Sequence, residues 1–356
     1  MSILQTALSQ SHIVSEATMV EFAGYLMPVK YKQGLIDEHN WTRNSCGIFD
    51  VSHMGQVIFE GENLNDIFSQ LTPSDFTKVK QSACKYTVLT NEDGGIIDDL
   101  IITKFSDNRF FVVWNASRKH IDLAHVLKHF PKISYQNLES RALIAVQGPK
   151  VLDTLSPIFH EIAEIGYMTA REILHEKYGK VILSRTGYTG EKGFEISVEN
   201  SLAPALWAEL LANDAVRPIG LGARDSLRLE VGYPLYGNDL NEGTDPISAG
   251  LSWVMSKNHS GYTGFEKISQ NNQVKRSGIL LEDKGVLRAG YEVFNAKGEK
   301  ISALTSGGYS PVLERSIGQA YLPINYEIGQ EVFIEIRGKK LKAIVHSISF
   351  VTTNPR

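Results

Sequence analysis

The chain has only two cysteines, Cys46 and Cys84, among its 356 residues. They are far apart in the sequence and are too few for a disulfide framework, so a reducing compartment is favoured. No apolar run approaches the roughly 20 residues that cross a membrane. Residues 1–14 lack the basic segment and apolar core of a secretion signal. We therefore expect a cytoplasmic protein without a membrane segment.

Signatures of several common functional classes are also missing. The net charge is −4, and no basic cluster with interleaved aromatic residues occurs, which argues against nucleic-acid binding. There is no phosphate-binding Gly-Lys-Ser/Thr loop, and residues 220–222 lack the third glycine of a dinucleotide-binding turn. His125 and His129 have the spacing of a zinc helix, but Val126 stands where a metalloprotease needs glutamate. We expect no metal and interpret both histidines as a polar helix face.

Length and patterning indicate several domains. A chain of this length exceeds what one hydrophobic core usually supports. Residues 56–136 read as strand, helix, strands and helix, which suggests a ferredoxin-like α+β unit, with Asn63 capping its first helix. The polar stretch 268–276 reads as a linker. After it, residues 275–356 read as short strands between turns, which predicts a small barrel or sandwich.

The stretch Asn91 to Ile102 carries the most unusual chemistry. A turn signal precedes a strand-like run, and Asp98 and Asp99 interrupt that run among isoleucines. Aspartate is depleted in strands and costly to bury unpaired. Because side chains alternate along a strand, one carboxylate should face a cavity and the other solvent or a backbone partner, which makes a proton-sharing dyad of the two unexpected. A bulge or turn whose aspartates cap nearby amides explains the pattern equally well.

Several longer motifs follow one another along the chain. They are Phe49 to Gly55, Asn91 to Leu100, Gln147 to Pro149, Ser184 to Glu195, Gly222 to Glu230 and Leu235 to Asp239. Taken together, the chain resembles the T-protein of the glycine cleavage system, the aminomethyltransferase family, from Ala23-Gly24 to the C-terminal strands.

The resemblance implies an α+β fold with three domains in a cloverleaf around a central folate cavity. The first domain would be discontinuous, comprising residues 1–55 and 137–267, which explains why residues 1–55 form no recognisable unit alone. The ferredoxin-like domain would be an insertion at 56–136. Residues 275–356 would form a β-barrel or jelly-roll-like domain.

The resemblance also implies an activity. The family transfers a one-carbon unit from an aminomethyl group, held on the dihydrolipoyl arm of the lipoylated H-protein, to tetrahydrofolate. Ammonia leaves, and the folate becomes its 5,10-methylene form. Because the carrier and the folate supply the reacting atoms, the enzyme needs no nucleophile or metal of its own. The implied partners are H-protein and tetrahydrofolate, the latter as a co-substrate.

Residue roles follow from the matched motifs. Asp99 matches the family aspartate that approaches the folate nitrogens, which implies a catalytic role. Glu195 matches the pterin-binding glutamate, and Arg224 matches a ligand-contacting arginine. Five residues match cavity-lining positions: Met54, Tyr86, Asn115, Tyr167 and Tyr188. Taken without the resemblance, most of these residues would be assigned to the core, Glu195 to an exposed strand and Arg224 to an ion pair on a helix.

Two departures and two alternatives accompany this assignment. Thr103 stands where some relatives have tyrosine, and residues 353–356 form a shorter end than in some, so the pocket rim is less defined. A related folate-binding family that aids iron–sulfur assembly has a cysteine in its signature, and residues 185–191 have none. Folate-dependent demethylating or amine-oxidising relatives remain alternatives, but the oxidising ones are usually fused to a flavin domain, for which this chain has no room.

Overall fold

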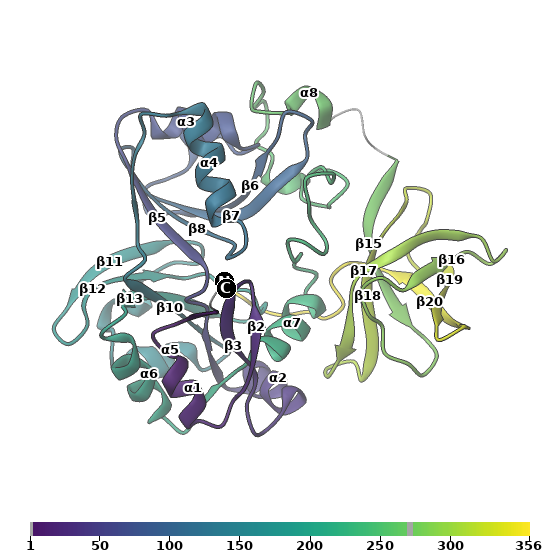
Figure 1. Cartoon of the computed structure of the whole chain (residues 1–356), viewed down its shortest axis with the longest axis horizontal. Coiled ribbons are helices and arrows are strands. Elements are labelled where there is room, and N and C mark those ends of the chain that lie inside the picture. The colour runs from purple at the N-terminus through teal and green to yellow at the C-terminus, as the bar shows by residue number, and fades with distance from the viewer. Residues whose placement is uncertain (1–2, 269–272) are drawn as a thin grey trace.

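The computed structural model describes residues 3–268 and 273–356, and their strands form four sheets. Figure 1 shows three parts around a centre, with the C-terminal barrel set to one side. The α+β class and the C-terminal barrel expected from the sequence are both confirmed. No helix among the described residues is both long and apolar enough to cross a membrane.

The first part is built around β4, whose five residues, Cys46–Asp50, are all buried. A strand that is apolar on both faces belongs in the middle of a covered sheet. Accordingly, β4 lies between β10 (Arg141–Gln147), which is antiparallel to it, and β14 (Val216–Pro218), which is parallel. Segments almost 170 residues apart in sequence therefore share one sheet, whose order is β11-β12-β13-β10-β4-β14.

The remaining elements of this part surround that sheet. A small sheet of order β1-β3-β2 precedes it, and its longer strands form a hairpin. Side chains of α6 pack into the main core, as their helical spacing predicts. The bounds are β1 Leu4–Gln5, α1 Ser9–Val14, β2 Thr18–Phe22, β3 Tyr25–Lys30, α2 Leu35–Asn44, α5 Val151–Leu155, β11 Ala170–His175, β12 Gly179–Ser184, β13 Gly193–Glu199, α6 Ala203–Leu211 and α7 Leu221–Glu230. The short helix α8, Phe265–Ile268, lies apart from this sheet, with Ile268 beside Gly94 (Figure 1).

The second part is a five-stranded antiparallel sheet of order β6-β7-β8-β5-β9, with α3 and α4 contributing to its core. Its bounds are β5 Gly55–Glu60, α3 Leu64–Leu71, β6 Cys84–Thr90, β7 Ile96–Ser106, β8 Arg109–Trp114, α4 Lys119–His129 and β9 Ser134–Asn137. The expected capping by Asn63 is wrong. Asn63 precedes α3, but it has a left-handed backbone (φ 61°) and its side chain makes no capping hydrogen bond.

The third part is a closed barrel of order β15-β18-β17-β16-β19-β20, so its strands have no free edge. The bounds are β15 Val274–Leu281, β16 Glu292–Phe294, β17 Lys300–Ser310, β18 Arg315–Pro323, β19 Glu331–Ile336 and β20 Lys339–His346. The expected linker 268–276 is too long, because β15 already begins at Val274. Residues 269–272 lie outside the described residues.

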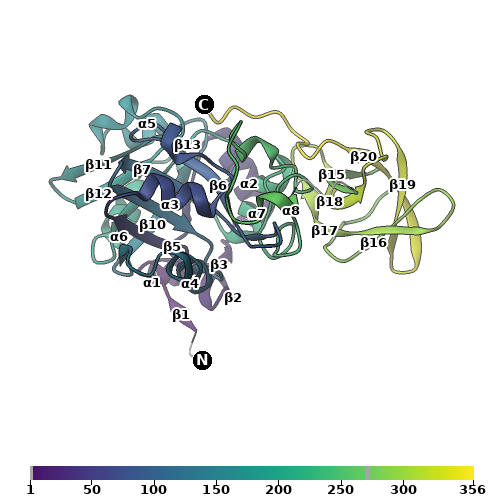
Figure 2. The ribbon, with the colours of Figure 1, turned by 90° about the horizontal axis from the view of Figure 1, so that it is seen from above.

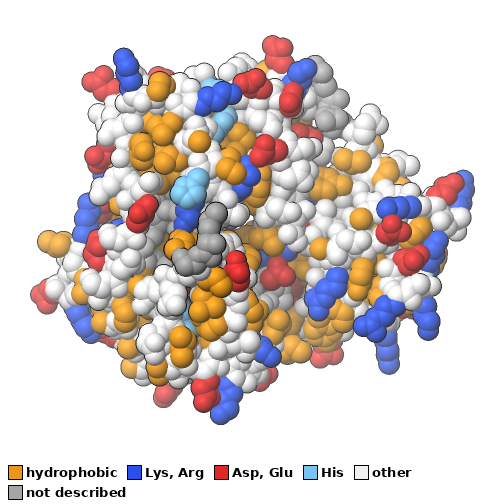
Figure 3. Space-filling view, in the orientation of Figure 1, with side chains coloured by type: hydrophobic (Ala, Val, Ile, Leu, Met, Phe, Trp, Pro, Cys, Tyr) orange, Lys and Arg blue, Asp and Glu red, His pale blue; other side chains and the backbone are white. Residues whose placement is uncertain are grey.

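Each part has its own buried apolar cluster. These clusters support, as a proposal, domain limits of 1–55 with 137–267, 56–136 and 275–356. After the barrel, the chain runs back toward the first part (Figures 1 and 2). On the face seen in Figure 3, acidic and basic side chains are interspersed over the outer end of the barrel.

Candidate active site

A cavity of about 970 Å³ lies where the three parts meet. Its walls come from β2, from β6 to β8, from the loop before β13, from α7 and from the barrel. The side chains that line the cavity include Val20, Tyr86, Glu195, Arg224 and Ser306. Pockets formed between domains are common places for small-molecule binding.

Asp99 on β7 lines this cavity. The Tyr86 hydroxyl donates a hydrogen bond to Asp99 Oδ2 at 2.9 Å, and Asn115 Nδ2 donates to Asp99 Oδ1 at 2.9 Å. Burial, and then the neighbouring charge of Asp98, raise the pKa of Asp99 to about 7. A carboxyl group with this pKa can take up or release a proton at neutral pH.

Asp98 has a different environment from its neighbour. Its side chain is fully buried and does not face solvent. The expected backbone partner is present, because the Asn115 main-chain N–H donates to Asp98 Oδ2 at 3.0 Å. Asn115 Nδ2 also donates to Asp98 Oδ1 at 2.9 Å. The two aspartates therefore share one amide group.

Gln147 holds the loop that precedes β13. Its Nε2 donates to the Thr186 carbonyl at 3.1 Å, and its Oε1 accepts from Thr189 Oγ1 at 2.9 Å. A Cβ on Gly187 or Gly193 would lie 1.9 or 2.1 Å from atoms of the Gln147 side chain. This close approach explains why the motif carries glycine at both positions.

Arg224 is a half-buried cation whose guanidinium makes no hydrogen bond to the described residues. Its Nη1 is buried without a hydrogen-bond partner among the described residues, and its guanidinium lies 4.7 Å from the centre of the Tyr188 ring. Burial lowers the pKa of Arg224. Glu195, on the cavity wall, accepts a hydrogen bond from Thr186 Oγ1 at 2.5 Å. A guanidinium at the cavity wall without hydrogen-bond partners suggests that a ligand completes its hydrogen bonds.

Aromatic side chains line other parts of the wall. Tyr86 stacks on Trp253, with ring centres 5.4 Å apart and an interplanar angle of 19°. Tyr188 stacks on Tyr233 at 5.8 Å, and its hydroxyl donates to the Pro234 carbonyl. Flat, polarisable surfaces of this kind suit a planar ring system.

The structure brings together all eight residues expected at the site. Each of the following lines the cavity: Met54, Tyr86, Asp99, Asn115, Tyr167, Tyr188, Glu195 and Arg224. Their individual roles remain predictions.

Sequence reasoning missed several residues of the wall. Trp253 is 61% exposed and covers Tyr86, and no residue spacing in the sequence marks it as part of a wall. Arg185 and Arg276 also line the cavity, and among the described residues neither forms an ion pair with a carboxylate. Together with Arg224, they give the cavity cationic groups that an anionic ligand could use.

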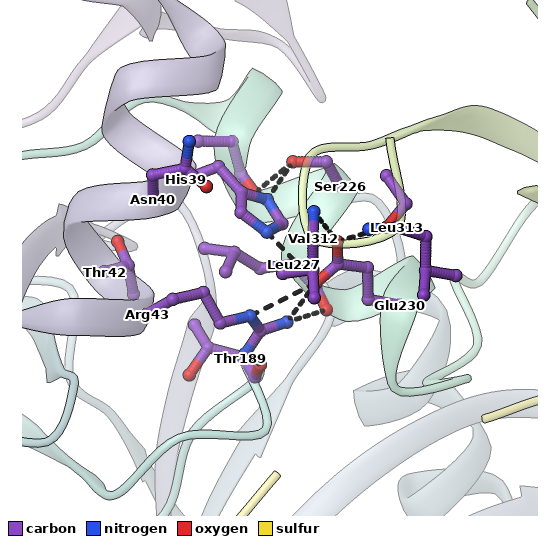
Figure 4. A network of polar contacts seen from close by, with 12 residues as sticks. His39, Asn40, Thr42, Arg43, Thr189, Ser226, Leu227, Glu230, Val312 and Leu313 are labelled. Carbon is purple, nitrogen blue, oxygen red and sulfur yellow. Dashed lines mark hydrogen bonds and ion pairs between the residues drawn. The ribbon is translucent and has the colours of Figure 1, made fainter. Parts of the chain in front are cut away.

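A buried polar network fixes α7, the helix that carries Arg224 (Figure 4). Glu230 Oε2 lies 3.0 Å from His39 Nε2 and accepts from Arg43 Nη2 at 2.8 Å. Glu230 Oε1 accepts from Ser310 Oγ at 2.6 Å. This network ties α7 to α2 on one side and to the barrel on the other.

The two histidines of α4 lie together, with ring centres 4.8 Å apart. Within residues 3–268 and 273–356, no group of three or more His, Cys, Asp or Glu side chains is arranged to hold a metal ion.

Comparison with known proteins finds relatives that match this chain along almost its whole length. Residues 8–259 match the family described as the GCVT N-terminal domain, and residues 275–351 match the glycine cleavage T-protein C-terminal barrel domain. The chain is 40% identical to an aminomethyltransferase of Phocaeicola vulgatus, over 97% of this chain and 99% of that one. It is 38% identical to an aminomethyltransferase of Prosthecochloris aestuarii, with coverage of 98% and 99%.

A solved structure agrees with these sequence matches. The glycine cleavage system aminomethyltransferase T from Bartonella henselae superposes with a TM-score of 0.95 at 35% identity, covering 99% of both chains. Two family domains in the expected order, near full-length relatives and a matching three-part fold lead to one conclusion: the chain belongs to the aminomethyltransferase family of glycine cleavage T-proteins.

Proposed function

We propose that the protein transfers a one-carbon unit from the aminomethyl-dihydrolipoyl arm of H-protein to tetrahydrofolate. Ammonia and 5,10-methylenetetrahydrofolate are the products, and the dihydrolipoyl arm is released. The observation that carries the proposal is the pairing, in one cavity, of a carboxyl group whose pKa is raised to about 7 with an arginine whose guanidinium has no hydrogen bond to the described residues.

The donor set of the cavity fits tetrahydrofolate as a substrate. A pterin ring presents adjacent N–H donors, and the Glu195 carboxylate can accept from them in a charge-assisted, two-point arrangement. The stacked Tyr86–Trp253 and Tyr188–Tyr233 pairs offer flat surfaces for its rings. The Arg224 guanidinium lines the cavity without a hydrogen bond to the described residues, so it offers donors to an acceptor on the ligand. A volume of about 970 Å³ is adequate for a molecule of this size.

Asp99 is the residue we assign to the chemistry. Tetrahydrofolate supplies the nucleophilic nitrogens, and the loss of ammonia develops positive charge on the carbon being transferred. The ionised carboxylate of Asp99 stabilises that charge and accepts a proton from the attacking nitrogen. Hydrogen bonds from Tyr86 and Asn115 hold its two oxygens in place. No covalent intermediate on the protein is needed.

Lipoylated H-protein is the partner that this reaction requires, and we propose it as such. We also propose that the reaction takes place in the cytoplasm, since both cysteines are buried as free thiols, which suits a reducing compartment.

The experiment is to incubate the protein with tetrahydrofolate and aminomethyl-loaded H-protein, and to measure ammonia and 5,10-methylenetetrahydrofolate together. Equal amounts of both products are expected, and neither should form when H-protein lacks its lipoyl group. Ammonia release that does not depend on tetrahydrofolate would contradict the proposal.

A further inference from the structure

Asp122 is a buried carboxyl group behind the site. It lies on α4, is fully buried, and neither of its oxygens accepts a hydrogen bond from an N–H or O–H group of the described residues. Its hydrogen-bond partner is the carboxyl group of Asp98. Two carboxyl groups can bond to each other only if one carries a proton, so the pair holds a proton in the folded state.

The contacts of Asp98 decide which member of the pair carries that proton. Asp98 already accepts from the main-chain N–H and from Nδ2 of Asn115. Burial raises the pKa of Asp98, but these donors oppose that rise and favour its ionised form, whereas Asp122 has no such donor. Burial, and then the Asp98 charge, raise the pKa of Asp122 to about 11. The proton therefore resides on Asp122, which donates to an ionised Asp98.

This pair is connected to the reacting carboxylate through one side chain. The Asn115 Nδ2 group contacts Asp98 Oδ1, Asp99 Oδ1 and the Asp99 carbonyl, all at 2.9–3.0 Å. Asp99 also lies directly after Asp98 on β7, so the Asp98 charge acts on it at short range.

Other charged or titratable groups near the cluster are engaged elsewhere. On α4, Arg118 is the cation nearest to Asp122, but its Nε donates to the Ile97 carbonyl and its Nη2 to Glu242. The Arg118 guanidinium also lies over the Tyr236 ring. On β6, the Tyr86 hydroxyl donates to Asp99, and Tyr188 faces the same carboxyl from the far wall.

We propose that Asp122 is a positioning residue, whose protonated carboxyl keeps Asp98 ionised behind the Asn115–Asp99 contact and so sets the pH above which Asp99 can accept a proton. The mechanistic value of this arrangement rests on the proposed function. The proton arrangement itself does not, and it can be measured without any substrate.

The first test is infrared spectroscopy of the intact protein at pH 8–9. The carbonyl band of a protonated carboxyl group should be present and should disappear in Asp122→Asn. Asp107→Asn, a change at an exposed ion pair beyond the end of β7, is the control and should keep the band. A spectrum without such a band, or one that Asp122→Asn leaves unchanged, overturns the proposal.

The second test follows the titration of Asp99 through stability. The difference in melting temperature between a protein and its Asp99→Asn derivative grows with pH and levels off near the folded-state pKa of Asp99. It should level off near pH 7 in the natural background and in Asp122→Asn, whose amide can still donate to Asp98. In Asp122→Leu, Asp98 takes up a proton and its charge is lost. The pH at which the melting-temperature difference stops growing should therefore fall by about one unit or more.

Asp98→Asn removes the same charge without changing α4, so it serves if Asp122→Leu does not fold. Its levelling point should also move down. The proposal is overturned if the variant that folds, Asp122→Leu or Asp98→Asn, shows no change in the pH at which the melting-temperature difference levels off. Absence of one-carbon transfer in the wild-type protein would instead contradict the proposed function, since neither test uses a substrate.

Discussion

At the scale of single residues, Asp99 shows how an unfavourable burial can serve chemistry. Its folded-state pKa is about 7, above the ordinary value near 4, because burial and the Asp98 charge oppose ionisation. The folded protein therefore binds this proton more tightly than the unfolded chain does. Ionising Asp99 costs stability as the pH rises from about 4 to 7, and that cost remains above pH 7.

Asp99→Asn should consequently fold and be more stable than the natural protein at pH 8, yet transfer the one-carbon unit about a hundred-fold or more slowly. In the natural enzyme the rate should fall as the pH drops through about 7, because the carboxylate becomes protonated. Steady-state rates and melting temperatures across pH 5–9 check both statements. Tyr86→Phe, which removes only one donor to Asp99, should lose much less. Equal small losses in the two variants would contradict the assignment.

Glu195 and Arg224 should behave differently from Asp99. They are assigned to parts of the folate whose bonding does not change, so their contribution is similar in the ground and transition states. Glu195→Gln and Arg224→Gln should raise the KM for tetrahydrofolate about ten-fold or more while lowering kcat less. A folate titration of each variant measures both constants. If Glu195→Gln abolishes kcat at an unchanged KM, binding and catalysis have been divided wrongly.

At the scale of elements, the position of α7 depends on Glu230. His39, Ser310 and Arg43 hold the pKa of Glu230 at about 2, against the opposing effect of burial. A carboxyl whose pKa is depressed by folding stabilises the folded state above its unfolded pKa, and this contribution is lost as the pH falls from about 4.5 toward 2. The network of Figure 4 is therefore at full strength at neutral pH.

Glu230→Gln should destabilise the protein by about 3–5 kcal/mol at pH 7, because Arg43 and His39 lose a buried, ionised acceptor. Glu92→Gln changes an exposed partner of Lys128 and should cost about 1 kcal/mol or less. Urea unfolding at pH 7 compares the two variants. Similar losses in both would show that the network contributes no more than a surface ion pair.

Regular elements were predictable where one periodicity dominated. The strand-like run that carries Asp98 and Asp99 is β7, and the short strands expected after the linker form the closed barrel. Asn63 was misjudged because local sequence does not reveal a left-handed backbone. The site itself was not derivable from pattern, since Glu195 and Arg224 meet only through the fold. Trp253 was missed because the 3-10 helix that holds it, Ser252–Val254, is too short for any residue spacing to mark a side chain as part of a wall.

At the scale of the whole molecule, the cavity has walls from all three parts, so a bound ligand should stabilise all three parts against unfolding. Tetrahydrofolate should bind without H-protein and stabilise the protein by about 2.7 kcal/mol at a hundred-fold excess over its Kd. Calorimetry with and without tetrahydrofolate measures the shift, and if the barrel melts separately its transition should also rise. Arg224→Gln should need more ligand for the same shift. No shift at saturating tetrahydrofolate would argue for a different substrate.

The place of β4 between β10 and β14 also determines the order in which the sheets can form while the chain is being synthesised. The segment from β5 to β9 contains all of its own pairing partners and can complete its sheet as soon as it leaves the ribosome. In contrast, β4 must wait until residues 216–218 have been made. At ~5–20 residues per second, that wait is roughly ten seconds or longer. The five-stranded sheet is thus complete before the sheet around β4, and the nascent chain meanwhile carries an apolar strand with an unpaired edge, of the kind that chaperones protect.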